Sequence, residues 1–246
     1  MYYPRNQVIF IAINKCGSSS VLQALNDALY DPDVPEIWQL QGKNKVRRVH
    51  ENLKHAQAYF YQQSLGKEAY DKCLTISQVR NPWDKMVSTF FFRCSSPKDQ
   101  TLWMRQRGWF VDHGLNGPTD IPDKALFTDF VRALDSREQI PHGPWSNISR
   151  VENLADSFKD NFNQLDGLTD VNGNVIVDQI LKFEELSETW GGLQALVKSA
   201  TGKTPGDLPH HNKTSRGNYR DYYTAETRDI VARLFQRDNE YFGYSF

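Results

Sequence analysis

Cysteine, long apolar runs and an excess of charge of one sign are all scarce in this chain of 246 residues. Its three cysteines (Cys16, Cys73 and Cys94) have unrelated spacings, which argues against a disulfide framework or a zinc pattern and favours reduced thiols. The longest apolar run, residues 8–13, is far shorter than the roughly 20 residues that span a bilayer, and it does not resemble a signal peptide. With 29 basic and 30 acidic side chains, the net charge of −1 argues against a general nucleic-acid binder. The sequence therefore predicts neither a membrane span nor a nucleic-acid partner.

The length and composition are those of a folded globular protein. A hydrophobic fraction of 39% and a charged fraction of 24% are typical of an ordinary folded domain and exclude general disorder. The length suits one large domain or two small ones. No internal repeat, low-complexity tract or Pro/Gly-rich linker divides the chain. We therefore predict a single domain over residues 1–246.

Candidate strands alternate with candidate helices along the chain. Residues 8–13 are apolar at every position, as in a strand buried on both faces, and residues 74–79 and 175–183 are further strand candidates. Amphipathic helices are expected at residues 21–29, 83–92, 126–134, 190–200 and 225–241. This order predicts the α/β class, with a central, mainly parallel β-sheet flanked by helices. The middle, about residues 93–172, is weakly periodic, and it is either an excursion that covers the ligand crevice or structural filler.

The first chemical signal is the turn that follows the first strand. It reads Asn14-Lys15-Cys16-Gly17-Ser18-Ser19-Ser20 and leads into the first helix. A helix N-terminus offers unpaired N–H groups and partial positive charge, so it attracts anions. Gly17 allows close approach of the backbone, and Lys15 adds a full charge. The turn is not the ATP-binding P-loop, because its lysine precedes its only glycine. A serine-capped helix without a ligand explains the same residues about as well.

The second signal is Arg80, which ends the strand at residues 74–79, with Ser88 eight residues later. In open α/β sheets, ligands bind beyond the carboxyl ends of the strands, where Arg80 lies. The guanidinium fork matches phosphate geometry, and the Ser88 hydroxyl adds a donor if the intervening residues are helical. An arginine that merely caps a turn is the alternative for this motif alone.

Together and in this order, the two signals resemble the cofactor motifs of sulfotransferases that use 3′-phosphoadenosine 5′-phosphosulfate (PAPS). The turn resembles the family's 5′-phosphosulfate loop, commonly P-K-T-G-[GST]-[ST]-S, and Arg80 with Ser88 resembles its 3′-phosphate motif. Segments nearer the C-terminus resemble the carbohydrate-modifying Golgi-type branch of the family and its bacterial relatives. These segments are residues 180–186, 208–216, 219–223 and 242–246. The departures are Asn14 for proline, Cys16 for threonine and Lys85 for arginine.

The resemblance implies a P-loop-like sulfotransferase domain with PAPS as co-substrate and no metal. Lys15 is then the catalytic residue that stabilises the leaving phosphate, and backbone N–H groups of the turn hold the 5′-phosphate. Arg80 and Ser88 would hold the 3′-phosphate, and a basic C-terminal loop would fold over the nucleotide. The implied PAPS-binding residues are Lys15, Cys16, Gly17, Ser18, Ser19, Ser20, Arg80, Ser88, Lys213, Thr214, Ser215 and Arg216.

An alcohol acceptor must lose a proton, so a general base is expected. The candidates are His50, His55, His113, His142, His210 and His211. We favour His55, because related carbohydrate sulfotransferases carry a histidine in a comparable place. The acceptor implied is a hydroxyl of a carbohydrate or another small molecule. No anchor precedes the first strand, so we expect a cytoplasmic enzyme of bacterial or viral type unless an N-terminal anchor has been removed.

Two other functions fit parts of the sequence. One is an ATP-dependent, P-loop-like kinase, which the missing G-K-[ST] disfavours. The other is a non-catalytic nucleotide-binding module, which the presence of Lys15 disfavours. The sequence does not determine the identity of the acceptor or the oligomeric state.

Overall fold

The computed structural model describes residues 1–31, 33, 55–95, 124–136, 163–209 and 217–246, apart from the side chains of residues 92–95. The chain divides into two compact units. The first comprises Met1–Asn81 and Gln164–Thr214, and the second Pro82–Asn163 and Ser215–Phe246. The single domain expected over residues 1–246 stays a prediction.

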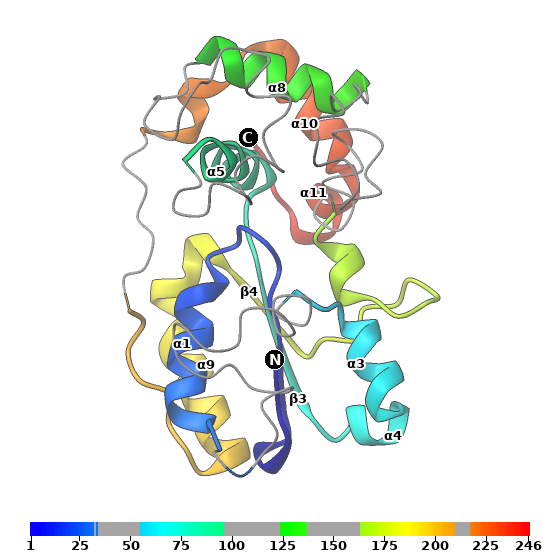
Figure 1. Cartoon of the computed structure of the whole chain (residues 1–246), viewed down its shortest axis with the longest axis vertical. Helices are drawn as coiled ribbons and strands as arrows, with labels where there is room; N and C mark the ends of the chain where they lie inside the picture. Colours follow the sequence, from blue (N-terminus) through cyan, green and yellow to red (C-terminus); the bar gives the residue numbers. More distant parts are fainter. Residues whose placement is uncertain (32, 34–54, 96–123, 137–162, 210–216) are drawn as a thin grey trace, which may run out of the picture. The chain divides into compact units, whose positions relative to one another are not determined.

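A four-stranded sheet forms the centre of the first unit (Figure 1). Its strands, in spatial order, are β1 (Tyr2–Tyr3), β2 (Val8–Ile11), β3 (Leu74–Val79) and β4 (Gln179–Lys182). β1 pairs antiparallel with β2, whereas β2, β3 and β4 run parallel. All of β2 and nearly all of β3 are buried, as expected for parallel strands covered on both faces. The predicted α/β class with a mainly parallel sheet is confirmed.

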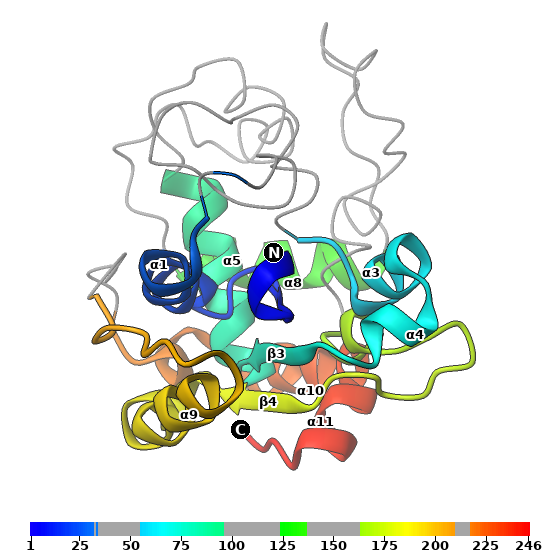
Figure 2. The ribbon, with the colours of Figure 1, turned by 90° about the horizontal axis from the view of Figure 1, so that it is seen from below.

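Helices cover both sides of this sheet (Figures 1 and 2). Helices α1 (Ser18–Leu29) and α9 (Leu186–Thr201) lie on one side, and α3 (Ala58–Leu65) and α4 (Lys67–Tyr70) on the other. Short 3-10 helices are η1 (Pro4–Asn6), η4 (Leu165–Leu168) and η5 (Phe183–Glu185).

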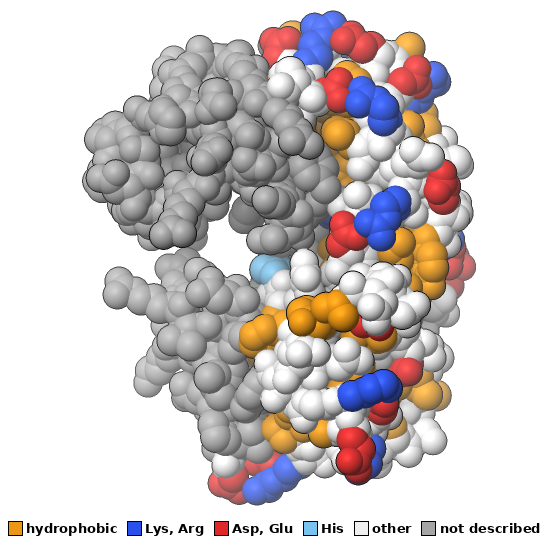
Figure 3. All heavy atoms as spheres, turned by 90° about the vertical axis from the view of Figure 1, so that its right-hand side faces the viewer, with side chains coloured by type: hydrophobic (Ala, Val, Ile, Leu, Met, Phe, Trp, Pro, Cys, Tyr) orange, Lys and Arg blue, Asp and Glu red, His pale blue; other side chains and the backbone are white. Residues whose placement is uncertain are grey.

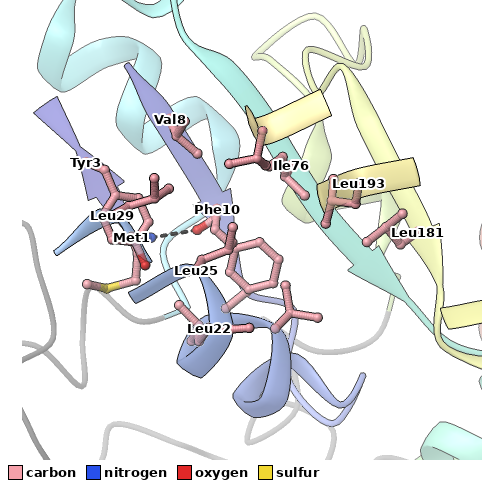
Figure 4. Close-up of a cluster of buried hydrophobic side chains, with 14 of the residues drawn as sticks. Met1, Tyr3, Val8, Phe10, Leu22, Leu25, Leu29, Ile76, Leu181 and Leu193 are labelled. Carbon is pink, nitrogen blue, oxygen red and sulfur yellow. Dashed lines mark hydrogen bonds between the residues drawn. The ribbon is translucent and has the colours of Figure 1, made fainter. Parts of the chain in front are cut away.

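The core of the first unit lies where α1 and α9 pack on the sheet (Figure 4). The side chains that meet there include Val8, Phe10, Leu22, Leu25, Leu29, Ile76, Leu181 and Leu193. The Met1 amino group donates a hydrogen bond of 2.6 Å to the Phe10 carbonyl oxygen beside this core. This packing holds β2 and β3 in place, and with them the residues that follow each strand.

The described part of the second unit is helical. It contains α5 (Pro82–Ser95), α8 (Lys124–Ser136), η6 (Tyr219–Tyr222), α10 (Ala225–Leu234) and α11 (Gln236–Phe242). Phe90 of α5 lies with its ring centroid 5.3 Å from those of Phe127 and Phe130 of α8. Arg132 donates two hydrogen bonds, of 2.9 and 2.6 Å, to the Glu226 carboxylate of α10. Aromatic packing and this ion pair join the three helices.

Strand β2 ends two residues earlier than the apolar run of residues 8–13 predicts. Ala12 and Ile13 are buried like β2 but lie outside the ladder. The carbonyl oxygens of Ala12 and Ile13 contact side chains instead of a neighbouring strand. His55 Nδ1 lies 2.7 Å from the Ala12 oxygen, and the Ser18 hydroxyl donates to the Ile13 oxygen at 3.2 Å. Burial therefore continues beyond the strand, because polar side chains satisfy the backbone there.

The third predicted strand and the last predicted helix also differ from expectation, whereas β3 has the predicted bounds. The strand expected over residues 175–183 is reduced to β4, because the Asp178 carboxylate accepts from both the N–H and the hydroxyl of Thr75 in place of ladder bonds. The helix expected over residues 225–241 is two helices, because Phe235 leaves the helical conformation, at φ −111° and ψ 26°. Among the described residues, no helix combines the length and apolar character needed to cross a membrane.

Candidate active site

Three segments follow the parallel strands at one edge of the sheet in the first unit. The turn of residues 14–20 follows β2, Arg80 follows β3, and Phe183 follows β4. Because the three strands are parallel, their carboxyl ends share this edge, which is where open α/β sheets bind ligands. The turn and Arg80 therefore lie in the same part of the first unit, whereas Ser88, the other residue of the second motif, belongs to the second unit.

The turn forms a cradle of backbone N–H groups at the start of α1. Lys15 and Gly17 adopt left-handed conformations, with φ of 62° and 78°. Among the described residues, no acceptor takes the amide protons of Gly17, Ser18 and Ser19, whereas the Ser20 amide donates to the Gly17 oxygen at 3.3 Å. We define Gly17–Ser19 as the cradle. Left-handed residues beside a helix start aim successive N–H groups at one point, so the arrangement suits an anion.

The serine-capped helix considered from the sequence does not occur. Gly17 is the N-cap residue of α1, and no side chain caps it. The Ser18 hydroxyl donates instead to the Ile13 carbonyl oxygen, at 3.2 Å. The donors at the start of α1 are therefore not used up by a capping side chain.

Gly17 has a packing role that the sequence does not reveal. A β-carbon at this position would lie 2.6 Å from both Cδ2 and Cε2 of Phe183, far inside van der Waals contact. Its φ of 78° is also unfavourable for residues with a side chain. The sequence pattern relates this glycine to the approach of an anion, and the Phe183 ring gives a second reason why only glycine fits.

Arg80 links the second motif to the first. Its side chain is buried, Nη1 donates to the Lys15 carbonyl oxygen at 3.1 Å, and the guanidinium carbon lies 4.2 Å from the centroid of the Phe183 ring. The neighbouring Asn81 N–H donates to the Glu184 carboxylate at 2.7 Å. Arg80 is thus held by the turn and by the segment after β4. Ser88 is half-buried in α5 and belongs to the second unit, so its pairing with Arg80 stays a prediction.

Gln164 is a site residue that the sequence pattern does not identify. Its side-chain amide donates to the Arg80 carbonyl oxygen and accepts from the Arg80 N–H, both at 2.8 Å. The same Oε1 also accepts from the Cys16 thiol at 2.9 Å. Cys16 is fully buried, and its thiol is directed at Gln164. Partners 84 and 148 residues away leave no signal in the local sequence around Gln164.

His55 contacts the chain just before the turn of residues 14–20. Its Nδ1 is 2.7 Å from the carbonyl oxygen of Ala12, the first residue after β2. A carbonyl oxygen only accepts, so Nδ1 carries the proton and the neutral ring has its lone pair on Nε2. His55 is half-buried. This tautomer is the one in which Nε2 can take a proton from an acceptor.

The remaining predicted site residues lie outside the described residues. These are Lys213, Thr214, Ser215 and Arg216, and the alternative bases His50, His113, His142, His210 and His211. Within the described ranges, no group of three or more His, Cys, Asp or Glu side chains could hold a metal ion. On the face in Figure 3, described Lys and Arg side chains are interspersed with Asp and Glu.

Comparison with known proteins identifies the family. The model of the sulfotransferase family matches residues 1–245, which include the turn, Arg80 and the segment after β4. Neither the curated proteins nor the solved structures gave a match. The match covers nearly the whole chain and agrees with the α/β sheet. The chain therefore belongs to the sulfotransferase family of enzymes, which use PAPS as the sulfate donor.

Proposed function

We propose that this protein moves the sulfuryl group of PAPS to a hydroxyl of a carbohydrate or another small acceptor and releases 3′,5′-adenosine diphosphate. The observation that carries the proposal is the cradle at the start of α1, with Lys15 beside it in the same turn. The cradle fits an oxyanion, since its three amide protons have no acceptor among the described residues. The carbohydrate class of acceptor is supported by the family, which includes carbohydrate sulfotransferases.

The chain's part in the transfer is to hold the two phosphate ends of the donor and to stabilise charge. PAPS supplies the sulfuryl group, which passes to the acceptor oxygen by in-line displacement. The Gly17–Ser19 amides hold the 5′ end, and the Lys15 ammonium stabilises charge that develops on the leaving phosphate. Arg80 binds the 3′-phosphate with Ser88, Lys213, Thr214, Ser215 and Arg216. No metal is needed in this scheme.

His55 is the proposed general base. Its Nδ1–H is fixed on the Ala12 carbonyl oxygen, so Nε2 is the nitrogen that accepts the proton of the acceptor hydroxyl. The proposal is supported by the contact of His55 with Ala12, which lies two residues before the turn proposed to bind the phosphosulfate end. The cytoplasmic location expected from the sequence stays a prediction.

Nucleotide selectivity tests the proposed donor. We expect calorimetry to show that 3′,5′-adenosine diphosphate binds at least about tenfold more tightly than ADP or ATP, because Arg80 meets a 3′-phosphate. In Arg80→Ala this preference should disappear. The matched control is Arg228→Ala, an exposed arginine of α10 that should leave selectivity unchanged. Equal or tighter binding of ATP would reject the sulfotransferase donor in favour of an ATP-dependent kinase.

Substitution of His55 by asparagine tests the base. Asparagine retains an N–H that can donate to the Ala12 oxygen, but it cannot take a proton at neutral pH. We expect kcat for an alcohol acceptor to fall about 10²- to 10⁴-fold, while the affinity for 3′,5′-adenosine diphosphate is retained. Steady-state kinetics with a panel of sugars measures kcat, and calorimetry measures the affinity. An asparagine variant with unchanged kcat would show that another residue is the base.

A further inference from the structure

A fully buried amide without partners lies directly beneath the cradle. Gln78, on β3, has no exposed surface, and neither Nε2 nor Oε1 has a hydrogen-bond partner among the described residues. Burying an amide without hydrogen bonds is unfavourable, because the amide loses its bonds to water and gains none in return, so such groups are rare in folded proteins. A glutamine at this place in a parallel strand therefore requires a reason other than packing.

The position of the amide relates it to the anion site. Gln78 Nε2 lies 3.4 Å from where a β-carbon of Gly17 would be, next to the Phe183 ring atoms that lie 2.6 Å from the same point. The neighbouring Val79 and Arg80 continue β3 toward the same edge of the sheet. The Gln78 side-chain amide therefore lies close to Gly17, the first residue of the cradle.

We propose that Gln78 is a donor-binding residue, whose Nε2 donates a hydrogen bond to an oxygen of the phosphosulfate end of the nucleotide. The inference rests on the proposed function and adds a specific contact to it. The amide is enclosed in the structure, so the contact requires the turn to shift or the Gln78 side chain to rotate when the anion binds. The unpaired amide is a cost in the free protein that the bound anion removes.

Gln78→Met separates this role from a structural one. Methionine keeps the length and apolar stem of glutamine but has no amide. We expect the free variant to be at least as stable as the unmutated protein, because an unpaired buried amide is removed. Its affinity for 3′,5′-adenosine diphosphate should fall about tenfold or more, because a hydrogen bond to a charged group is lost. Stability and binding thus move in opposite directions, which a packing role does not predict.

Nucleotides that lack one phosphate locate the contact. Gln78→Met should weaken binding of adenosine 5′-monophosphate by a similar factor and leave binding of adenosine 3′-monophosphate unchanged. The control is Gln194→Met in α9, whose amide donates to the Pro205 and Gly206 carbonyl oxygens at 2.9 and 3.2 Å. That variant should lose stability without losing affinity for any of the three nucleotides.

Unchanged affinity of Gln78→Met for 3′,5′-adenosine diphosphate, with normal binding by the unmutated protein, would overturn the Gln78 inference alone. If the unmutated protein binds none of the nucleotides, the proposed function fails and the inference with it. Gln78→Glu covers the case in which the methionine variant does not fold. It has nearly the same shape but places a carboxylate against the anion, so we expect affinity to fall further, and an affinity equal to that of glutamine would also overturn the inference.

Discussion

Lys15→Ala should lower the rate of sulfuryl transfer about 10²- to 10³-fold, the usual loss when one group that stabilises transition-state charge is removed. The ammonium acts on charge that develops only as the bond to the leaving phosphate breaks. The ground-state hold on the nucleotide comes from the Gly17–Ser19 amides and Arg80, so binding of 3′,5′-adenosine diphosphate should change only a few-fold. A loss in kcat with little change in affinity is therefore the expected signature.

Release of 3′,5′-adenosine diphosphate from PAPS, followed with the best acceptor of a sugar panel, measures the rate. Lys72→Ala is a suitable control, because Lys72 is an exposed lysine whose ion pair with Glu68 lies within one short segment. It should retain full activity. Full activity in Lys15→Ala as well would remove Lys15 from the mechanism, whereas lost nucleotide binding would show that it serves in the ground state.

Gln164→Leu should produce the largest loss of stability among the site variants, about 3 kcal/mol or more. Leucine has a similar volume but removes the hydrogen bonds that Gln164 makes to the buried Arg80 N–H and carbonyl, and it removes one contact of the Cys16 thiol, which also lies 3.4 Å from the Asn14 oxygen. Each unsatisfied buried group costs about 1–3 kcal/mol, less for the weakly polar thiol. Denaturant unfolding followed by fluorescence measures this loss. A change below about 1 kcal/mol would mean that the amide does not hold these segments together.

The nucleotide affinity of Gln164→Leu tests its positioning role separately from its effect on stability. Because Gln164 positions the backbone of Arg80 and the turn at Cys16, the leucine variant should bind 3′,5′-adenosine diphosphate more weakly even at temperatures where it is fully folded. Cys16→Ala loses the thiol contacts to Gln164 and to the Asn14 oxygen but keeps both hydrogen bonds between Gln164 and Arg80, so it should be milder in both respects. A double-mutant cycle between the two positions should show coupling, since they share a hydrogen bond.

Much of the first unit could be predicted from local pattern. The continuous apolar runs at residues 8–13 and 74–79 predict buried parallel strands, and parallel strands bring the residues after them to one edge. The strand pattern alone is therefore enough to assign the turn and Arg80 to one site. The extent of the third strand could not be predicted, because it depends on the Asp178 carboxylate, which replaces ladder bonds to Thr75.

The parts of the site that the sequence does not reveal are those held by contacts distant in the chain. Gln164 and Gln78 look like ordinary polar residues in the sequence. Only the fold shows that the first has three partners and that the second has none among the described residues. The family resemblance favours His55, and the structure adds its tautomer through Ala12. The roles of these residues follow from neighbours that periodicity and spacing do not identify.

The Phe183 ring contacts both Gly17 and Arg80, so substitutions at residues 17, 80 and 183 constrain one another. One side of the ring occupies the space that a side chain at Gly17 would need, and the guanidinium of Arg80 lies over it. A related protein with alanine or serine at position 17 is therefore expected to carry a smaller residue at position 183, and its arginine would lose the aromatic surface. Residues 17, 80 and 183 are therefore expected to covary among related proteins, although residues 17 and 183 are far apart in the sequence.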